Sequence, residues 1–260
     1  MPSHGEERGI LYIVGSGPGS PDQMTGKALQ AIRDAEYVLG NDSYLTPLSP
    51  LIEGKKVIRS SMGKEVERAR EAVALARDHV VAMVSGGDPG VYGMASIVIE
   101  VAERSGSGTR IEVIPGVTAA TAAASRLGSP LSGDFTIVSL SDLLTPMEVI
   151  EERLKHAFAM GIPVVLYNPR SRGRPHNFAR AMEIAASYRD PSTPLGLVKN
   201  AYRDGEEVVI TTLGQVFTII DQVDMHSAVI VGGTESRIWM EGSHARGIIT
   251  PRGYHRKYLY

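Results

Sequence analysis

The chain has 260 residues, of which 43% are hydrophobic and 22% charged, and its formal net charge is −2. This is long enough for two globular domains, and the lack of any cysteine excludes disulfides, thiolate metal sites and cysteine nucleophiles. The balanced charge, the absence of a membrane-length apolar run and the polar first residues lead us to expect a cytoplasmic protein with no nucleic-acid or membrane partner and no metal.

Strand-like and helix-like runs alternate through the first half of the chain. Apolar runs predict strands at 9–15, 36–40, 80–86 and 110–116. Helical patterns lie between them at 25–35, with Thr25 as N-cap, and at 64–79, 94–104 and 117–128. This β–α–β order predicts a parallel sheet covered by helices.

The second half has a different pattern, beginning after the Gly, Pro and Ser residues of 127–135. We therefore expect two α/β domains, 1–128 and 129–260. Strands are predicted at 135–141, 163–169, 194–200, 206–213 and 227–233, and helices at 146–160 and 175–188. The turn-like AYRDG between two of these strands predicts a hairpin, and hence a mixed sheet in the second domain.

The first strand runs into GSGPGS (15–20), which looks like a dinucleotide-binding loop. That loop needs a third glycine where Ser20 stands, and a helix directly after it. Here Pro18 has no N–H for a phosphate, and SPDQM delays the helix. Asp42 is the only candidate for a ribose ligand after the second strand. The nicotinamide hypothesis is therefore disfavoured, and a Walker loop fails because no Gly-Lys-Ser/Thr follows.

Two further loops follow predicted strands. SGGDPGVYG (85–93) carries four glycines, an Asp and a Tyr, which suit close backbone approach to an adenosyl group. PGVTAA (115–120) places Thr118 in the first turn of a helix, where free backbone N–H groups can hold a polar ligand. Taken singly, the first is also compatible with a plain strand–helix connection and the second with simple helix capping.

Together GSGPGSPDQMT, SGGDPGVYG and PGVTAA resemble the tetrapyrrole methylases, which use S-adenosylmethionine as methyl donor. The resemblance implies two α/β domains with the active-site cleft between them, and commonly a homodimer. In the second half, LSDLLTP, YNPRSRGRP and the 193–214 segment are similar to the cobalamin-pathway members that methylate C-17 of precorrin-3B or cobalt-factor III and contract the ring. The first two segments favour the cobalt-containing substrate.

The resemblance also assigns site residues. The donor contacts carried over are Pro18, Gly87, Asp88, Val91, Tyr92, Thr118, Ala119, Leu166, Tyr167 and Ala201. Methyl transfer from a sulfonium needs alignment and exclusion of water rather than a nucleophile or metal. No motif in the sequence identifies a general base. Asp142 and Tyr167 are the candidates, and Tyr92 is a further guess.

The acceptor carries acetate and propionate groups, and arginine binds carboxylates through its planar fork. NPRSRGRP places Arg170, Arg172 and Arg174 just after a predicted strand, although a solvated loop has the same composition. Lys64 and Arg203 are further candidates, as are Arg59, Ser61 and Arg252.

Three alternatives remain open. A sister methylase acting on another corrin position or a non-tetrapyrrole acceptor would share the donor loops. A nicotinamide oxidoreductase would bind NADPH. A non-catalytic sensor would bind the donor and transfer nothing.

Overall fold

The computed structural model describes residues 9–259, which form two compact units that divide between Thr118 and Ala119. The division lies before the expected boundary at 128 because helix α5 (Ala119–Arg126) packs on the second sheet, through Ala120, Ala123 and Ala124. None of the helices in the described range is long and apolar enough to cross a membrane.

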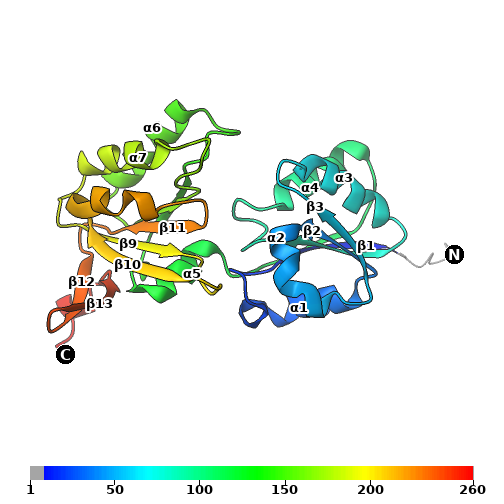
Figure 1. Ribbon diagram of the computed structural model, residues 1–260, viewed down its shortest axis with the longest axis horizontal. Coiled ribbons are helices and arrows are strands. Elements are labelled where there is room, and N and C mark those ends of the chain that lie inside the picture. The colour runs from blue at the N-terminus through cyan, green and yellow to red at the C-terminus, as the bar shows by residue number, and fades with distance from the viewer. Residues whose placement is uncertain (1–8, 260) are drawn as a thin grey trace. The chain divides into compact units, whose positions relative to one another are not determined.

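The first unit is a five-stranded parallel sheet with helices on both faces (Figure 1). Its strands lie in the order β3 (Lys56–Ser60), β2 (Tyr37–Asn41), β4 (Val80–Ser85), β1 (Ile10–Gly15) and β5 (Ile111–Ile114). The helical segments are η1 (Pro21–Gln23), α1 (Gly26–Asp34), α2 (Asp42–Leu45), η2 (Thr46–Leu51), α3 (Glu65–Leu75) and α4 (Ala95–Ser105). The expected parallel sheet is confirmed.

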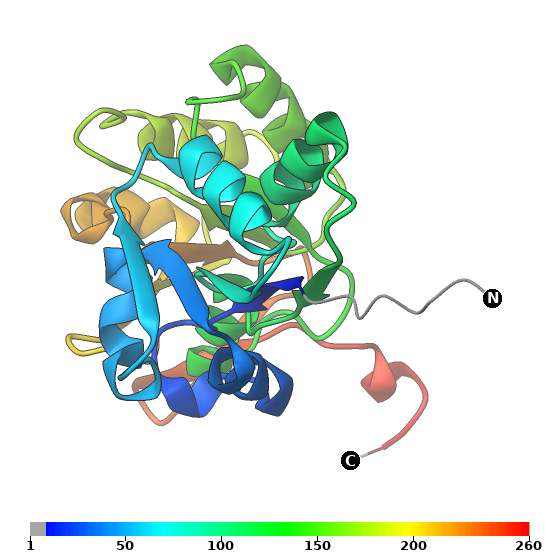
Figure 2. The same cartoon turned by 90° about the vertical axis from the view of Figure 1, so that its right-hand side faces the viewer.

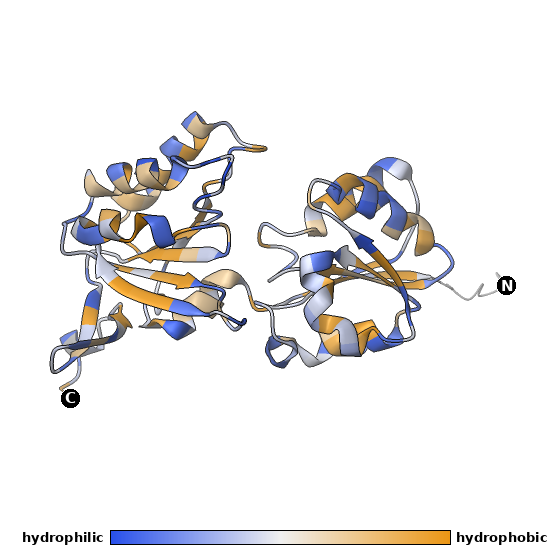
Figure 3. Ribbon diagram, viewed as in Figure 1, coloured by the Kyte–Doolittle hydropathy of each residue, from blue (hydrophilic) through white to orange (hydrophobic). Residues whose placement is uncertain are grey.

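Each face of this sheet is covered by its own helices. Helix α1, capped by Thr25 through Ala28 N–H at 3.1 Å, packs on the face of Val14 and Val84. Helices α3 and α4 lie side by side on the opposite face, over Ile13 and Met83 (Figure 2). Alternate residues of a strand point to opposite faces, so strands buried on both sides are apolar throughout, as Figure 3 shows.

The second unit contains a mixed five-stranded sheet, as expected. Its order is β10 (Glu207–Thr212), β9 (Pro194–Lys199), β11 (Ser227–Val231), β8 (Val164–Tyr167) and β7 (Thr136–Ser139). Strands β7 and β8 are parallel and the other pairs antiparallel. One face packs against α6 (Met147–Ala159), α7 (Asn177–Ala186), η3 (Leu213–Thr218) and η4 (Ile220–Gln222). Helix α5 covers the other face.

A small third sheet completes the second unit. Its order is β12 (Arg237–Glu241), β13 (His244–Ile249) and β6 (Gly128–Ser129), and η5 (Tyr254–Arg256) follows it. Strand β13 pairs with β6 in parallel, which ties the end of the chain to the segment just after α5. No pattern in the sequence predicted this sheet.

Candidate functional site

The carboxyl ends of β1, β4 and β5 bring the three glycine-containing loops to one edge of the first sheet. Neighbouring strands β1 and β4 lead to helices on opposite faces, since α1 follows β1 and α4 follows β4. Open α/β sheets bind ligands at such a switch point, outside the carboxyl ends of the strands. The fold therefore marks this edge as the candidate site of the first unit.

The first two loops are joined by their backbones. Gly17 N–H donates to Gly87 C=O at 3.1 Å, and Gly87 N–H donates to Gly17 C=O at 2.9 Å. Both glycines have positive φ, +67° and +65°, which other residues rarely adopt. Ser16 N–H is bonded to Ser85 C=O as well. The N–H groups that a dinucleotide loop offers to a pyrophosphate are thus used internally, and Pro18, which is buried, has none.

The third loop packs against the other two without space for a side chain. A Cβ on Gly116 would lie 2.2 Å from Gly87 C=O, and one on Gly15 would lie 2.6 Å from Gly116 N. Asp88 links the loops further, because one carboxylate oxygen accepts Gly90 N–H at 2.8 Å and the other accepts Gly116 N–H at 3.0 Å. Asp88 therefore holds the second and third loops together, in addition to the contact with the methyl donor that was expected of it.

The other residues of this unit that were predicted to contact the methyl donor lie in or beside the joined loops. Gly87, Val91 and Thr118 are half-buried, and Tyr92 is exposed with φ of +52°. A non-glycine residue with positive φ costs free energy that the surrounding loop must offset. The edge thus offers backbone groups, a hydroxyl and an aromatic ring within a rigid frame, which is what an adenosyl ligand requires.

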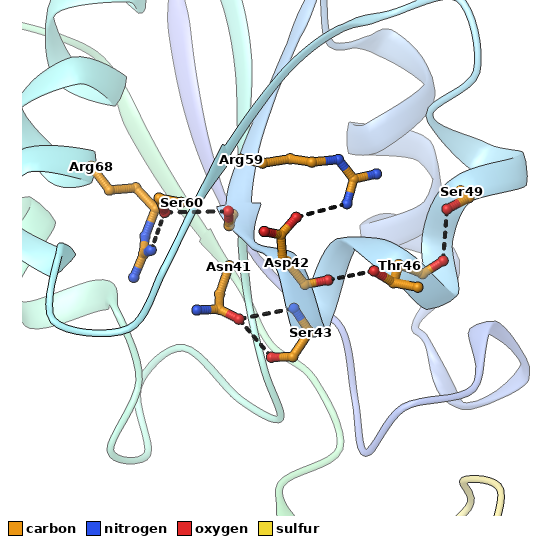
Figure 4. Close-up of polar contacts among 9 residues, drawn as sticks. Asn41, Asp42, Ser43, Thr46, Ser49, Arg59, Ser60 and Arg68 are labelled. Carbon is orange, nitrogen blue, oxygen red and sulfur yellow. Dashed lines mark hydrogen bonds and ion pairs between the residues drawn. The ribbon is translucent and has the colours of Figure 1, made fainter.

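The ends of β2 and β3 form a separate polar group (Figure 4). Asn41 caps α2 by accepting Ser43 N–H at 2.9 Å, and Asp42 pairs with Arg59 at 3.1 Å. Asp42 is thereby engaged away from β1, which further disfavours a ribose-binding role. The expected acceptor candidate Lys64 lies exposed at the start of α3 and pairs with Glu67 at 2.8 Å.

Arg68 is a residue that sequence reasoning missed. Its side chain is only 5% exposed, donates to Ser60 Oγ and lies 3.5 Å from Met94 Sδ. Met94 N–H in turn donates to Ser85 Oγ. Arg68 therefore supports, through Met94, the loop of residues 85–93. An arginine in a polar helical run is the usual pattern of a solvated face, and no sequence signal distinguishes this one.

In the second unit, three of the donor candidates, Ala119, Tyr167 and Ala201, lie in α5 or in the apolar cluster on its side of the sheet. Tyr167, at the end of β8, accepts Ala120 N–H on its hydroxyl at 2.6 Å and so caps the helix. Ala201, in the turn between β9 and β10, packs in the same apolar cluster. Ala119 begins the helix. Leu166 is fully buried between β7 and β11, so its side chain is a core contact.

The turn that holds Ala201 is fixed to α5 by polar contacts. Tyr202 and Ser125 share a hydrogen bond of 2.7 Å between hydroxyls, and Glu206 pairs with Arg126 at 2.7 Å. The hydrogen bond that the Arg126 guanidinium donates to the Glu206 carboxylate raises the pKa of Arg126. Arg203, which was expected to bind the methyl acceptor, is half-buried in this turn. Its backbone N–H donates to Asn200 C=O.

The three arginines follow β8, and the structure gives them unequal roles. Arg170 donates to Ile220 C=O at 2.8 Å and pairs with Asp221 at 3.2 Å. Arg174 Nε lies 3.9 Å from Asp142, at the long end for an ion pair. Arg172 is exposed at the tip of the loop. Arg170 is thus an anchor of η4, Arg174 is largely buried beside Asp142 and Met225, and Arg172 is the most accessible of the three.

Comparisons with known proteins identify the family of this chain. Residues 10–216 match the family described as Tetrapyrrole (Corrin/Porphyrin) Methylases. The chain belongs to the tetrapyrrole methylase family. It is 43% identical over 246 residues to the probable cobalt-factor III C(17)-methyltransferase of Salmonella typhimurium, covering 94% of this chain and 99% of that protein.

Another similar protein is longer than this chain. The chain is 48% identical over 251 residues to the cobalamin biosynthesis protein CbiHC of Archaeoglobus fulgidus, covering 96% of this chain but 54% of that protein. The chain thus spans about half the length of that relative.

Solved structures share the fold. The methyltransferase CobJ superposes with a TM-score of 0.86 at 32% identity, covering 94% of this chain and all of that one. A uroporphyrin-III C-methyltransferase from Thermus thermophilus, in complex with S-adenyl homocysteine, gives a TM-score of 0.67 at 28% identity. It covers 86% of this chain and 97% of that one.

Proposed function

We propose that this chain is an S-adenosylmethionine-dependent methyltransferase of corrin biosynthesis that methylates C-17 of cobalt-factor III, or of its metal-free counterpart precorrin-3B, with ring contraction. The observation that carries the proposal is the 43% identity to the Salmonella protein over nearly the full length of both chains. The glycine loops at the switch point of the first sheet support it independently, because they suit an adenosyl ligand and not a dinucleotide.

The donor contacts in this proposal come from the loops described above. Once bound, the donor would supply a methyl group on a cationic sulfur, and in-line transfer of that methyl group to the acceptor carbon would release the sulfur as a neutral thioether. Backbone groups around Gly87 and Val91 and the Thr118 hydroxyl would hold the adenosyl portion, with Tyr92 beside it. The bonds that tie Asp88 to the loops keep these groups in place before the donor arrives, so little ordering entropy is spent on binding. The family resemblance adds Pro18 and the second-unit residues Ala119, Leu166, Tyr167 and Ala201.

The acceptor carboxylates would be held by Arg172 and Arg174. Replacing each by Ala is expected to weaken acceptor binding by about tenfold or more, because a charge-assisted hydrogen bond contributes about 1.5–3 kcal/mol. Donor affinity should stay the same. Arg170→Ala is the matched variant from the same loop, with a smaller expected effect, since its guanidinium is already engaged by η4. Unchanged acceptor affinity in all three variants would remove this loop from the site.

For proton transfer, the two candidate groups differ in availability. Asp142 is exposed beside Arg174, in the loop that follows β7. Tyr167 already accepts a helix N–H. Asp142 is therefore the stronger candidate for a general base, and Asp142→Asn should lower the rate of ring contraction more than donor affinity.

The test is an anaerobic incubation with methyl-labelled S-adenosylmethionine and cobalt-factor III, followed by mass spectrometry and absorbance. One labelled methyl group in the product, with a spectral change, is the expected result. Donor binding without transfer to cobalt-factor III or precorrin-3B would favour a sister methylase or a sensor. Binding of NADPH in place of the donor would revive the oxidoreductase alternative. A homodimer located in the cytoplasm is part of the proposal, and sedimentation velocity tests the dimer.

A further inference from the structure

Two adjacent leucines project from the loop between β7 and α6. The side chain of Leu143 is 77% exposed and that of Leu144 is 93% exposed. Single exposed aliphatic residues are common, but two neighbouring leucines at this exposure leave a continuous apolar surface on the tip of one loop.

The loop that carries them is anchored at both ends. Leu140 N–H donates to Tyr167 C=O at 2.8 Å, and Leu140 C=O accepts Asn177 Nδ2 at 2.8 Å. On the other side, Pro146 C=O accepts the N–H groups of Val149 and Ile150, which begin α6. Only a few residues lie between these anchors, so the leucines are held in position rather than carried on a long free segment.

The arginine loop lies beside this tip. Strands β7 and β8 are parallel neighbours, with Ser139 opposite Tyr167, so the loops after them leave the same edge of the sheet. Asn168 Nδ2 donates to Ser139 Oγ at 2.9 Å, and Arg174 Nε lies 3.9 Å from Asp142, the residue before the leucines.

The arginine loop itself is a tight turn. Ser171 and Arg174 exchange backbone hydrogen bonds of 3.3 and 3.1 Å, which leaves Arg172 at the tip. A fixed apolar surface and two guanidinium groups therefore stand next to each other at one edge of the second sheet.

We propose that Leu143 and Leu144 contact the ring of the acceptor macrocycle while Arg172 and Arg174 bind its carboxylates. The inference rests on the proposed function and adds two acceptor-binding residues to it. The acceptor has a broad apolar ring with a negatively charged fringe, and this edge presents the complementary pair of surfaces. The ring covers the leucines only when the acceptor is bound, which explains why apolar side chains stand exposed in the free chain.

Charge complementarity favours this occupant over a second copy of the chain. A protein interface built on the leucines would have to desolvate the neighbouring arginines or pair them with acidic groups, whereas the acceptor brings carboxylates of its own. Arg174 is poorly satisfied in the free chain, because its Nε is buried and without a hydrogen-bond partner among the described residues. Its Nη2 contacts Met225 Sδ, at 3.4 Å, and an incoming carboxylate would compete with Asp142 for the guanidinium.

The test compares wild type with the double variant Leu143→Asn/Leu144→Asn. The control is Met160→Asn, since Met160 is 63% exposed at the far end of α6, where β8 begins, and lies away from both loops. Three quantities are measured: KM for cobalt-factor III, affinity for S-adenosylmethionine by calorimetry, and the sedimentation coefficient.

Burying one leucine side chain against a ligand changes the affinity for that ligand by about tenfold or more. The double variant should therefore raise KM for cobalt-factor III at least about tenfold. Donor affinity and sedimentation should not change, and the control should behave as wild type. An unchanged KM, or a sedimentation change that accompanies the loss, would overturn the inference. If wild type transfers no methyl group, the proposed function is refuted. The leucine contact is then tested by absorbance titration of cobalt-factor III into wild type and into the double variant. Equal affinity of the two proteins for cobalt-factor III would contradict the leucine contact.

Discussion

Gly116→Ala tests whether the three loops of the first unit form one rigid frame. The added Cβ would lie 2.2 Å from Gly87 C=O and 2.9 Å from the Gly15 backbone. Real Cβ atoms essentially never approach closer than 3.0 Å, so the loops must separate by about 0.8 Å. Gly116 has no positive φ, so the effect is steric rather than conformational.

The cost follows from the bonds that this separation strains. Overpacking costs about 1–3 kcal/mol, and each weakened backbone hydrogen bond adds about 1 kcal/mol. The paired Gly17–Gly87 bonds and the Asp88–Gly116 bond are all exposed to the shift. We therefore expect a loss of about 2–4 kcal/mol in the free energy of unfolding. A misplacement of this size also lowers the transfer rate by up to about 10²-fold, because the reacting atoms must be aligned closely.

The assay is chemical denaturation together with donor calorimetry. Gly26→Ala is the matched control, since nothing lies within 4 Å of its Cβ position and it stands at the start of α1 in the same unit. The control should be at least as stable as wild type, because alanine favours a helix over glycine, and should keep wild-type donor affinity. A Gly116→Ala protein with unchanged stability and donor affinity would refute the rigid-frame argument.

Three further predictions concern single polar groups. Asp88→Asn should cost about 1–3 kcal/mol in urea denaturation, because an amide cannot accept both backbone N–H groups as the carboxylate does; an unchanged midpoint would contradict it. Tyr167→Phe removes the acceptor of Ala120 N–H and should cost about 1 kcal/mol by the same assay, and a loss below about 0.3 kcal/mol would rule out the capping role. Hydrogen bonds from Arg180 lower the pKa of Glu151, so that pair stabilises the fold above the unfolded pKa of 4.5 and ceases to do so as pH falls through the folded pKa. Glu151→Gln should therefore lower the melting temperature at pH 7, and this loss should shrink as pH falls below 4.5; a loss that does not depend on pH would disprove the linkage.

The sequence predicted most of the regular elements because periodicity and capping act locally. The buried strands β1, β4 and β11 and the helix capped by Thr25 were anticipated to within one or two residues. Helix α3 ends at Leu75 rather than at residue 79. The helical pattern continues past that point, but the chain turns there and begins β4 at Val80.

What the sequence did not predict depends on tertiary pairing. Strand β3 has no fully buried residue, most residues of β12 are exposed and half of those of β13 are, so no long apolar run marks these strands. Strand β6 is two residues long and exists only because β13 lies beside it. The contact between Arg68 and Met94 and the reciprocal Gly17–Gly87 hydrogen bonds join residues far apart in the chain. The glycine loops and the arginine run, in contrast, were visible because composition alone singled them out.

The most direct test of the central claim is to locate the transferred methyl group. The enzyme would be incubated anaerobically with cobalt-factor III and S-adenosylmethionine carrying a ¹³C-methyl group, and the purified product examined by NMR. We predict a single labelled methyl group on C-17 of a contracted ring. A label on any other ring carbon, or on none, would contradict the proposed reaction.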